Sequence, residues 1–182
     1  MRVITGIAKG KRLETLEGLD IRPTTDKVKE AIFSSIQFEI FDTEILDLFA
    51  GTGQMGIEAL SRGARAAVFV DNSRRSLEVV KKNLEITNFS SKSTVINMNG
   101  IDFASTTSKK FDFIFLDPPY NKGILLEILP VLSNKLTDEG QIICEYEKNL
   151  DLPEKIGDLR LKKTQKYGKI KISMYYVDRK DE

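Results

Sequence analysis

The chain has 182 residues, of which 41% are hydrophobic and 30% are charged, and its formal net charge is +1. This is the composition of one ordinary globular domain. With no histidine and a single cysteine, Cys144, the chain excludes histidine triads, histidine metal sites, an intramolecular disulfide and a cysteine-rich zinc site. No metal is expected, so any chemistry must come from carboxylates, hydroxyls, backbone groups, Lys, Arg or a bound cofactor.

The apolar runs of the sequence are shorter than the ~20 residues that cross a membrane. The first residues also lack the apolar core of a secretory signal, so we expect a cytoplasmic protein. Positive charge gathers in two clusters, one around Lys9, Lys11 and Arg12 and the other between Arg160 and Lys171. Such clusters suit the phosphate backbone of a nucleic acid, but they are also typical of solvated surfaces.

The predicted elements, in chain order, alternate between strand and helix after a short N-terminal segment. Residues 1–22 hold short apolar runs broken by glycines, which indicates a small β-hairpin extension. A helix is expected to begin near Asp26, because Val28, Ile32 and Ile36 form one apolar stripe. The later strands are predicted at 45–49, 66–70, 94–97, 111–116, 140–146, 159–167 and 170–177, and the later helices at 55–62, 73–87 and 123–133.

This alternation predicts a parallel sheet with crossover helices, and hence a doubly wound, Rossmann-like α/β fold. The sheet would have seven strands, mostly parallel, and would end in an antiparallel pair. Ligands bind to such sheets at the carboxyl ends of the strands. Gly51–Gly53, Asp71 and Asp117 each follow a predicted strand, so we expect all three at one edge of the sheet.

A glycine-rich turn follows the first of these strands. Gly51-Thr52-Gly53-Gln54-Met55-Gly56 matches G-x-G-x-x-G between a strand and a helix, and Asp71 lies twenty residues beyond Gly51. Glycine lets the backbone approach a ligand closely, and an acid at Asp71 can accept hydrogen bonds from ribose hydroxyls. Both NAD and S-adenosylmethionine contain such a ribose, so the turn alone leaves an NAD-linked oxidoreductase open.

The acid within the same strand favours the second cofactor. Asp47 precedes Gly51 by four residues, and a buried carboxylate there would repel the pyrophosphate of a dinucleotide. It would instead attract the sulfonium or ammonium group of S-adenosylmethionine. Asp47 can also serve as a structural acid that accepts from the N–H groups of the glycine turn. One carboxylate can fill both roles.

The tetrapeptide Asp117-Pro118-Pro119-Tyr120 follows a predicted buried strand. A residue before proline is held extended, and proline contributes no N–H, so the segment presents a carboxylate and backbone carbonyls, all of them acceptors. These acceptors match the two donors of an exocyclic amino group, and Tyr120 can stack on a base. An Asp-Pro turn with Tyr120 as a packing residue is the alternative interpretation.

Several motifs together resemble one family. Asp47-Leu48-Phe49-Ala50-Gly51-Thr52-Gly53 resembles the first motif of class I S-adenosylmethionine-dependent methyltransferases, and Asp117-Pro118-Pro119-Tyr120 the fourth motif of those that methylate exocyclic amino groups. The full set of motifs is similar to the bacterial 16S rRNA (guanine-N(2))-methyltransferases of the RsmD type. The remaining matches are Met1–Gly6, Lys9–Leu13, Arg22–Phe33, Gly56–Ala64 and Lys166–Gly168.

The resemblance implies a role for each matching residue. The residues that would contact S-adenosylmethionine are Asp47, Phe49, Ala50, Gly51, Gly53, Asp71 and Asp102. The guanine would lie against the catalytic residues Asp117, Pro118, Pro119 and Tyr120. The RNA would contact Lys11, Arg12, Arg22 and Thr24. Asp102 stands one residue further from its strand than the family's acid. Residues 1–22 would form the hairpin extension, and residues 23–182 would form a single methyltransferase domain.

The resemblance also implies 16S rRNA as the substrate. The basic clusters are too small to bind bare RNA tightly, so we expect the RNA to be bound within an assembled or partly assembled small ribosomal subunit, and we expect a monomeric enzyme. Three alternatives remain besides the NAD-linked enzyme. An adenine amino-group methyltransferase of DNA shares the fourth motif, but we expect no added target-recognition region in the five residues after Val177. A pyrimidine C5-methyltransferase needs a nucleophilic cysteine, and Cys144 lies in a predicted buried strand. A non-catalytic RNA-binding protein could use the basic clusters alone.

Overall fold

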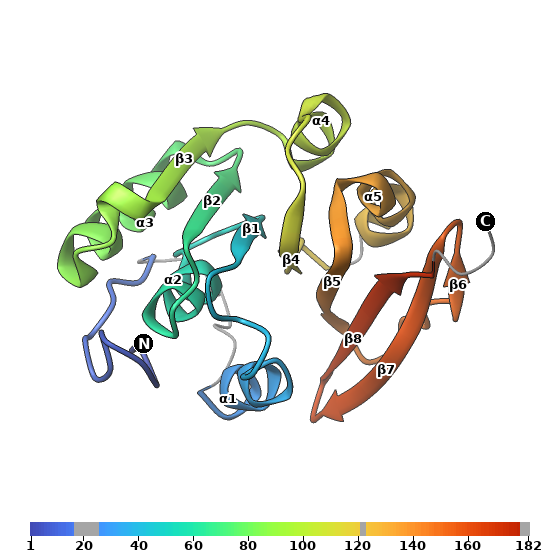
Figure 1. Cartoon of the computed structure of the whole chain (residues 1–182), viewed down its shortest axis with the longest axis horizontal. Coiled ribbons are helices and arrows are strands. Elements are labelled where there is room, and N and C mark those ends of the chain that lie inside the picture. The colour runs from blue at the N-terminus through green and yellow to red at the C-terminus, as the bar shows by residue number, and fades with distance from the viewer. Residues whose placement is uncertain (17–25, 121–122, 179–182) are drawn as a thin grey trace.

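The computed structural model describes residues 1–16, 26–120 and 123–178, and within them it forms a doubly wound α/β fold (Figure 1). The described strands make one eight-stranded sheet in the order β3-β2-β1-β4-β5-β8-β7-β6. The strands are β1 (Glu44–Leu48), β2 (Ala66–Asp71), β3 (Ser93–Asn97), β4 (Phe111–Leu116), β5 (Leu136–Glu147), β6 (Lys155–Ile156), β7 (Leu159–Tyr167) and β8 (Ile170–Val177). The first five are parallel, whereas β8, β7 and β6 continue the sheet antiparallel.

The helices cover both faces of the sheet, and each face has its own core. The helices are α1 (Asp26–Ser35), α2 (Gln54–Ser61), α3 (Arg74–Thr87), α4 (Gly100–Thr106) and α5 (Ile124–Leu132), with short 3-10 turns at Ser90–Lys92 and Ser133–Lys135. Buried residues of α1, α2 and α3 join one apolar cluster, and those of α4 and α5 join the other. None of the described helices is long and apolar enough to span a bilayer.

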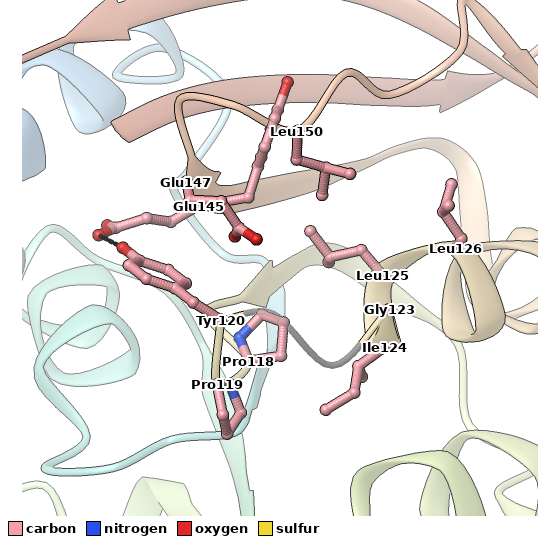
Figure 2. A pocket seen from close by; sticks show the side chains of 11 residues that line it. Pro118, Pro119, Tyr120, Gly123, Ile124, Leu125, Leu126, Glu145, Glu147 and Leu150 are labelled. Carbon is pink, nitrogen blue, oxygen red and sulfur yellow. Dashed lines mark hydrogen bonds between the residues drawn. The ribbon is translucent and has the colours of Figure 1, made fainter. Parts of the chain in front are cut away.

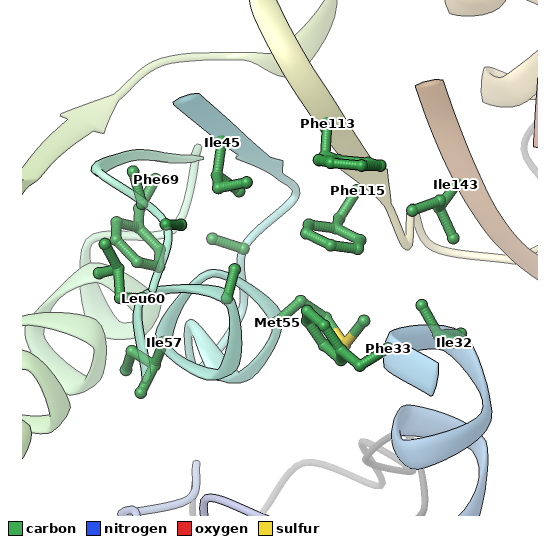
Figure 3. Close-up of a cluster of buried hydrophobic side chains, with 14 of the residues drawn as sticks. Ile32, Phe33, Ile45, Met55, Ile57, Leu60, Phe69, Phe113, Phe115 and Ile143 are labelled. Atoms are coloured by element: carbon green, nitrogen blue, oxygen red, sulfur yellow. The ribbon is translucent and has the colours of Figure 1, made fainter. Parts of the chain in front are cut away.

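Aromatic packing holds α1 beneath the centre of the sheet. Phe33 of α1 lies against Phe115 of β4, with ring centroids 5.4 Å apart and planes at 45°. Met55 at the start of α2 and Ile143 of β5 complete this part of the core, as Figure 3 shows. Offset and tilted aromatic pairs are favourable beyond their buried area. The packing therefore fixes the position of α1 relative to the ends of β4 and β5.

The sequence predicted most of these elements, and the fold class is confirmed. The bounds of β4 agree with the predicted 111–116, and Ser73 caps α3 as expected by accepting a hydrogen bond from the Ser76 N–H. The predicted strand count of seven is wrong for the described residues, because β6 adds an eighth. A two-residue strand is too short to give a recognisable alternation. Helix α4 was also not predicted, since its seven residues span less than two full turns.

The N-terminal segment turns back on itself as expected, although only an isolated antiparallel bridge between Arg2 and Arg12 joins its two arms. The Val3 N–H donates to the Lys11 carbonyl and the Leu13 N–H to the Met1 carbonyl. Val3 and Leu13 are buried in the same cluster as α1 and α2, so the segment packs onto the domain. The predicted boundary between residues 22 and 23 lies outside the described residues and stays a prediction.

One buried carboxylate attaches this segment to α2. Glu58 is fully buried and accepts hydrogen bonds from the N–H groups of Ile4 and Thr5 at 2.8 and 3.0 Å. It also pairs with Arg62 at 2.9 Å and with the buried ammonium of Lys29 at 3.5 Å. A buried charge is tolerated only when it is paired and hydrogen-bonded, and Glu58 meets both conditions. The N-terminal segment, α1 and α2 therefore share one polar network.

Glu58→Ala should destabilise the fold, because it leaves the charges of Lys29 and Arg62 without their partner. Breaking a buried pair from one side costs about 3–5 kcal/mol. Urea unfolding at pH 7 measures the loss. The matched control is Glu14→Ala, whose half-exposed carboxylate pairs with Lys82 at 3.5 Å and should cost less than about 1 kcal/mol. Equal losses in the two variants would contradict this account of the network.

Candidate active site

The register of the sheet aligns carboxylates at the carboxyl ends of adjacent strands. Asp47 of β1 pairs with Phe69 of β2 on one side and with Phe115 of β4 on the other. Phe69 and Phe115 face the core beneath α1, α2 and α3. Side chains alternate along a strand, so Asp71 and Asp117, each two residues further on, are directed to the same face. Three neighbouring strands thus carry an acid on one side of one edge.

The next strand adds a fourth acid that sequence reasoning did not single out. Leu116 of β4 pairs with Cys144 of β5, which places Glu145 beside Asp117. Ile143 faces the same core as Phe115, so Glu145 shares its side of the sheet. We call Asp71, Asp47, Asp117 and Glu145 the acidic row. The signal was present in the sequence, since Glu145 is the one charged residue in the predicted strand 140–146.

Asp47 is the deepest member of the acidic row. It is 5% exposed, and its Oδ2 accepts a hydrogen bond from the Gly56 N–H at 2.9 Å. A Cβ at Gly56 would lie 2.4 Å from the Phe69 ring and 3.2 Å from the Asp47 carboxylate, so this glycine permits the close contact of α2 with the sheet. Burial raises the pKa of Asp47 to about 7; the Gly56 hydrogen bond opposes the rise and repulsion from Asp71 adds to it. Asp47 therefore has the structural role that the sequence left open.

Asp71 holds the turn that follows β1. Its Oδ2 accepts from the Gly51 N–H at 2.9 Å and its Oδ1 from the Ser73 N–H at 2.8 Å. These bonds orient the carboxylate at the strand end, and each oxygen keeps a second lone pair for a ligand hydroxyl. Gly51 has φ +55°, and a Cβ there would meet nothing within 4 Å, so the outer side of the turn is open.

Phe49 and Ala50 connect β1 to the glycine turn. Phe49 has φ +66°, a conformation that costs a non-glycine residue energy and recurs at functional sites. Its ring lies so close to Gly100 that a Cβ there would approach it to 2.7 Å, which brings the start of α4 beside the turn. The Ala50 N–H donates to the Val70 carbonyl at 3.0 Å. Asp102 lies in the first turn of α4 with an exposed side chain, and its adenine contact stays a prediction.

The start of α2 carries a buried polar atom that fits a ligand. Gln54 follows the glycine turn and is 8% exposed, yet its Oε1 has no hydrogen-bond partner. A buried acceptor without a partner costs free energy that a donor from a ligand would recover. The ammonium group of S-adenosylmethionine is such a donor. The residues present therefore fit this cofactor through an open glycine turn, an acid at the ribose position and unfilled acceptor capacity.

The segment after β4 lies beside a pocket (Figure 2). Pro118 is buried, while Asp117, Pro119 and Tyr120 are exposed. The pocket lies between this segment, the end of β5 and the start of α5. Its lining residues include Pro118, Pro119, Tyr120, Leu125, Glu145 and Glu147. The Tyr120 hydroxyl donates to Glu145 Oε1 at 3.3 Å.

The charges of neighbouring carboxylates in the acidic row act on Asp117. Loss of hydration, then repulsion from Glu145 and Asp47, raises the pKa of Asp117 well above that of a free aspartate. The side chain is nevertheless exposed, so solvent offsets part of the first cause, and repulsion between the carboxylates is the firmer one. The acidic row therefore favours a positive charge placed among its members.

Of the four predicted RNA-binding residues, Lys11 and Arg12 lie in the described N-terminal segment. Lys11 donates to the Ile86 carbonyl near the end of α3, and Arg12 is exposed. Arg22 and Thr24 lie outside the described residues. The second basic cluster reaches the edge that carries the acidic row, because Lys166 pairs with Lys171 near the turn between β7 and β8 and the Lys148 N–H donates to the Lys169 carbonyl. Exposed Lys166 and Lys169 therefore lie at the site's end of the sheet.

Comparison with known proteins identifies the family. The family described as conserved hypothetical protein 95 matches residues 1–176. The chain belongs to this family, the RsmD methyltransferases. It is 32% identical to "Ribosomal RNA small subunit methyltransferase D" of Escherichia coli strain K12, over 100% of this chain and 92% of that protein. It is 38% identical to "Putative rRNA methyltransferase YlbH" of Bacillus subtilis, over 96% and 98%.

Solved structures of other proteins show the same architecture. "Putative methyltransferase yhhF from Escherichia coli" superposes with a TM-score of 0.87 at 33% identity and covers 98% of each chain. A ribosomal protein L11 methylase of Lactobacillus delbrueckii, at 18% identity and a TM-score of 0.74, shares the fold alone. The resemblance read from the motifs is thus confirmed for the family and for the class I methyltransferase fold.

The raised pKa of Asp47 predicts a pH dependence of stability. Its pKa is about 7 in the folded state against an ordinary 3.8, so the folded protein keeps this proton over a window in which the unfolded chain has lost it. The free energy of unfolding should therefore fall as pH rises from about 4 to about 7. The contribution has an upper limit of about 4 kcal/mol, from three pKa units.

Asp47→Asn removes this titration while keeping an acceptor for Gly56. Urea unfolding of both proteins at several pH values between 4.5 and 7.5 gives the comparison. We expect the free energy of unfolding of the variant, relative to that of the wild type, to increase as pH rises. Parallel pH profiles for the two proteins would show that Asp47 ionises at its ordinary pH in the fold.

Proposed function

We propose that this RsmD family member transfers a methyl group from S-adenosylmethionine to the exocyclic amino group, N2, of a guanine in 16S rRNA. This proposal rests mainly on one observation, the acidic row together with the Asp117–Tyr120 segment. It combines a site for a cationic cofactor with acceptors for an amino-bearing base on one edge of the sheet. Relatives named as small-subunit ribosomal RNA methyltransferases, 32% identical over the whole chain, support ribosomal RNA as the substrate.

The cofactor would lie across the carboxyl ends of β1 and β2. Asp71 would accept from its ribose hydroxyls, and the open turn at Gly51 and Gly53 would let the backbone approach it. Asp47 and the unpartnered Oε1 of Gln54 would attract its positive groups. When bound, this cofactor supplies a methyl group on a positively charged sulfur. The expected contacts of Phe49, Ala50 and Asp102 belong to the same proposal.

Asp117 and the carbonyl groups beside the prolines would hold the two N–H donors of the guanine amino group. Those bonds turn the nitrogen lone pair out of the ring plane, toward the methyl donor, and stabilise the positive charge that develops on nitrogen. Holding the reactants in this geometry contributes much of the acceleration. Asp117 then accepts the proton that the methylated nitrogen loses, for which its raised pKa suits it. Tyr120 would stack on the base.

Ribosomal RNA would approach over the basic surfaces that flank the acidic row. A row of carboxylates repels phosphate, so the backbone must be held elsewhere, and exposed Lys166 and Lys169 stand at the same edge of the sheet. Lys11, Arg12, Arg22 and Thr24 would contribute from the N-terminal side. Two small basic surfaces on a nearly neutral protein favour a particle that adds protein contacts, an assembled or partly assembled small subunit. The enzyme would act as a monomer.

The proposed function is tested by the identity of the product. Small ribosomal subunits from a strain that lacks the enzyme are incubated with the protein and methyl-labelled S-adenosylmethionine, and their RNA is digested to nucleosides. Label in N(2)-methylguanosine is the expected result. Label in methyladenosine would replace the proposal with an adenine enzyme, and an unlabelled digest would favour a non-catalytic RNA-binding protein. Naked 16S rRNA run in parallel tests the choice of substrate.

Asp117→Ala should lower the turnover number by about 100- to 1,000-fold, by analogy with the loss of a preorganised hydrogen-bonding group. Cofactor affinity should change by much less, because Asp71 and the glycine turn remain. The matched control is Asp158→Ala, an exposed acid in the turn before β7, which should leave the rate unchanged. A folded Asp117→Ala protein with near-normal turnover would remove the carboxylate from the mechanism.

A further inference from the structure

The Asp117–Tyr120 segment does not by itself distinguish guanine from adenine. Its acceptors match an exocyclic amino group, and both purines carry one. The ring nitrogen beside that group differs between them. Guanine presents N1–H, a donor, next to its 2-amino group, whereas adenine presents N1 as a bare acceptor next to its 6-amino group. Selection of guanine therefore requires a second acceptor close to the first.

We propose that Glu145 is this acceptor and that it selects guanine by binding the N1–H of the target base. The inference rests on the proposed function, because it assigns one more contact to the same base. A carboxylate that binds the guanine N1–H would repel the N1 lone pair of adenine. Glu145 would thus act as a specificity determinant, while Asp117 binds the amino group that accepts the methyl.

The sheet places Glu145 at the required position. Leu116 of β4 is in register with Cys144 of β5, so Asp117 and Glu145 lie side by side on neighbouring strands. Adjacent strands are about 4.8 Å apart, a spacing that lets two carboxylates reach neighbouring donors on one edge of a purine. Both acids are directed to the same face. After burial, repulsion from Glu145 is a further cause of the raised pKa of Asp117.

The surroundings of Glu145 are those of a binding group rather than a surface acid. Its side chain is 7% exposed, and it lines the pocket together with Pro118 and Tyr120 (Figure 2). The Tyr120 hydroxyl donates to Oε1 at 3.3 Å, which orients the carboxylate. A carboxylate offers about four lone-pair sites, so it can accept hydrogen bonds from more than one donor at once. A base that stacks on Tyr120 would bring its edge toward Glu145.

The test uses 2,6-diaminopurine, which keeps the 2-amino group of guanine but has no hydrogen on N1. Once the target guanosine has been mapped by product analysis, small subunits are reconstituted with 16S rRNA that carries either nucleoside at that position. The wild-type protein should have a kcat/KM about 10- to 100-fold higher on guanosine, the range expected for one hydrogen bond to an ionised acceptor. A wild type without activity on guanosine would overturn the proposed function itself.

Glu145→Gln keeps the size of the side chain but loses its charge, and its amide can donate to a bare N1. We expect kcat/KM on guanosine to fall about 10- to 100-fold and that on diaminopurine to stay within about 3-fold, so that the preference disappears. Calorimetric cofactor binding and thermal melting show that the variant is folded. An equal fall on both substrates, or an unchanged preference, would overturn the role of Glu145.

Tyr120→Phe separates this role from a structural one. It removes the hydrogen bond to Glu145 and keeps the aromatic ring. If Glu145 serves only to position Tyr120, then Tyr120→Phe should abolish the guanosine preference as Glu145→Gln does, and the inference fails. If Glu145 contacts the base, the rate falls on both substrates in Tyr120→Phe while the preference stays within about 3-fold of the wild type.

Discussion

Repulsion among the carboxylates of the acidic row is the constraint on which the site depends. Four adjacent parallel strands share one register, and the two-residue period of a strand directs Asp71, Asp47, Asp117 and Glu145 to the same face. Burial, and after it repulsion from neighbouring carboxylates of the row, raises the pKa of both Asp47 and Asp117. The fold tolerates this cost because backbone N–H groups fix both acids, Gly56 of α2 donating to Asp47 and Gly51 of the glycine turn donating to Asp71. A cationic ligand would relieve it.

The same constraint explains why the surrounding backbone is shaped as it is. The N–H groups of Gly51 and Gly56 hold the carboxylates of Asp71 and Asp47. The contact at Gly56 requires glycine, because a Cβ at this position would clash with the Phe69 ring. Phe49 adopts a left-handed conformation directly after β1, where the chain leaves the strand and enters the glycine turn. One half-turn further along α2 than Gly56, Glu58 attaches the N-terminal segment to this helix with a fully paired buried charge. The glycine turn thus positions the site, and α2 in turn positions the glycine turn.

Sequence reasoning reached the fold and most of the candidate site because both depend on short-range patterns. The glycine turn, Asp47, Asp71 and the Asp117–Tyr120 segment each stand directly at a strand end, where alternation and turn residues are informative. Glu145 was missed because its meaning comes from the pairing of β4 with β5, a contact between segments nearly thirty residues apart. The short elements α4 and β6 were missed because they contain too few residues to display a period. The contact of Lys11 with the end of α3 is likewise tertiary.

The central claim is that this edge of the sheet binds a sulfonium cofactor and not a dinucleotide. The motif G-x-G-x-x-G with Asp71 is common to both interpretations, and only the acidic row separates them. Isothermal titration calorimetry of the wild-type protein with S-adenosylmethionine and, separately, with NAD tests this most directly. The account predicts saturable heat with S-adenosylmethionine and none with NAD at millimolar concentration. Saturable binding of NAD, with no heat from S-adenosylmethionine, would contradict it.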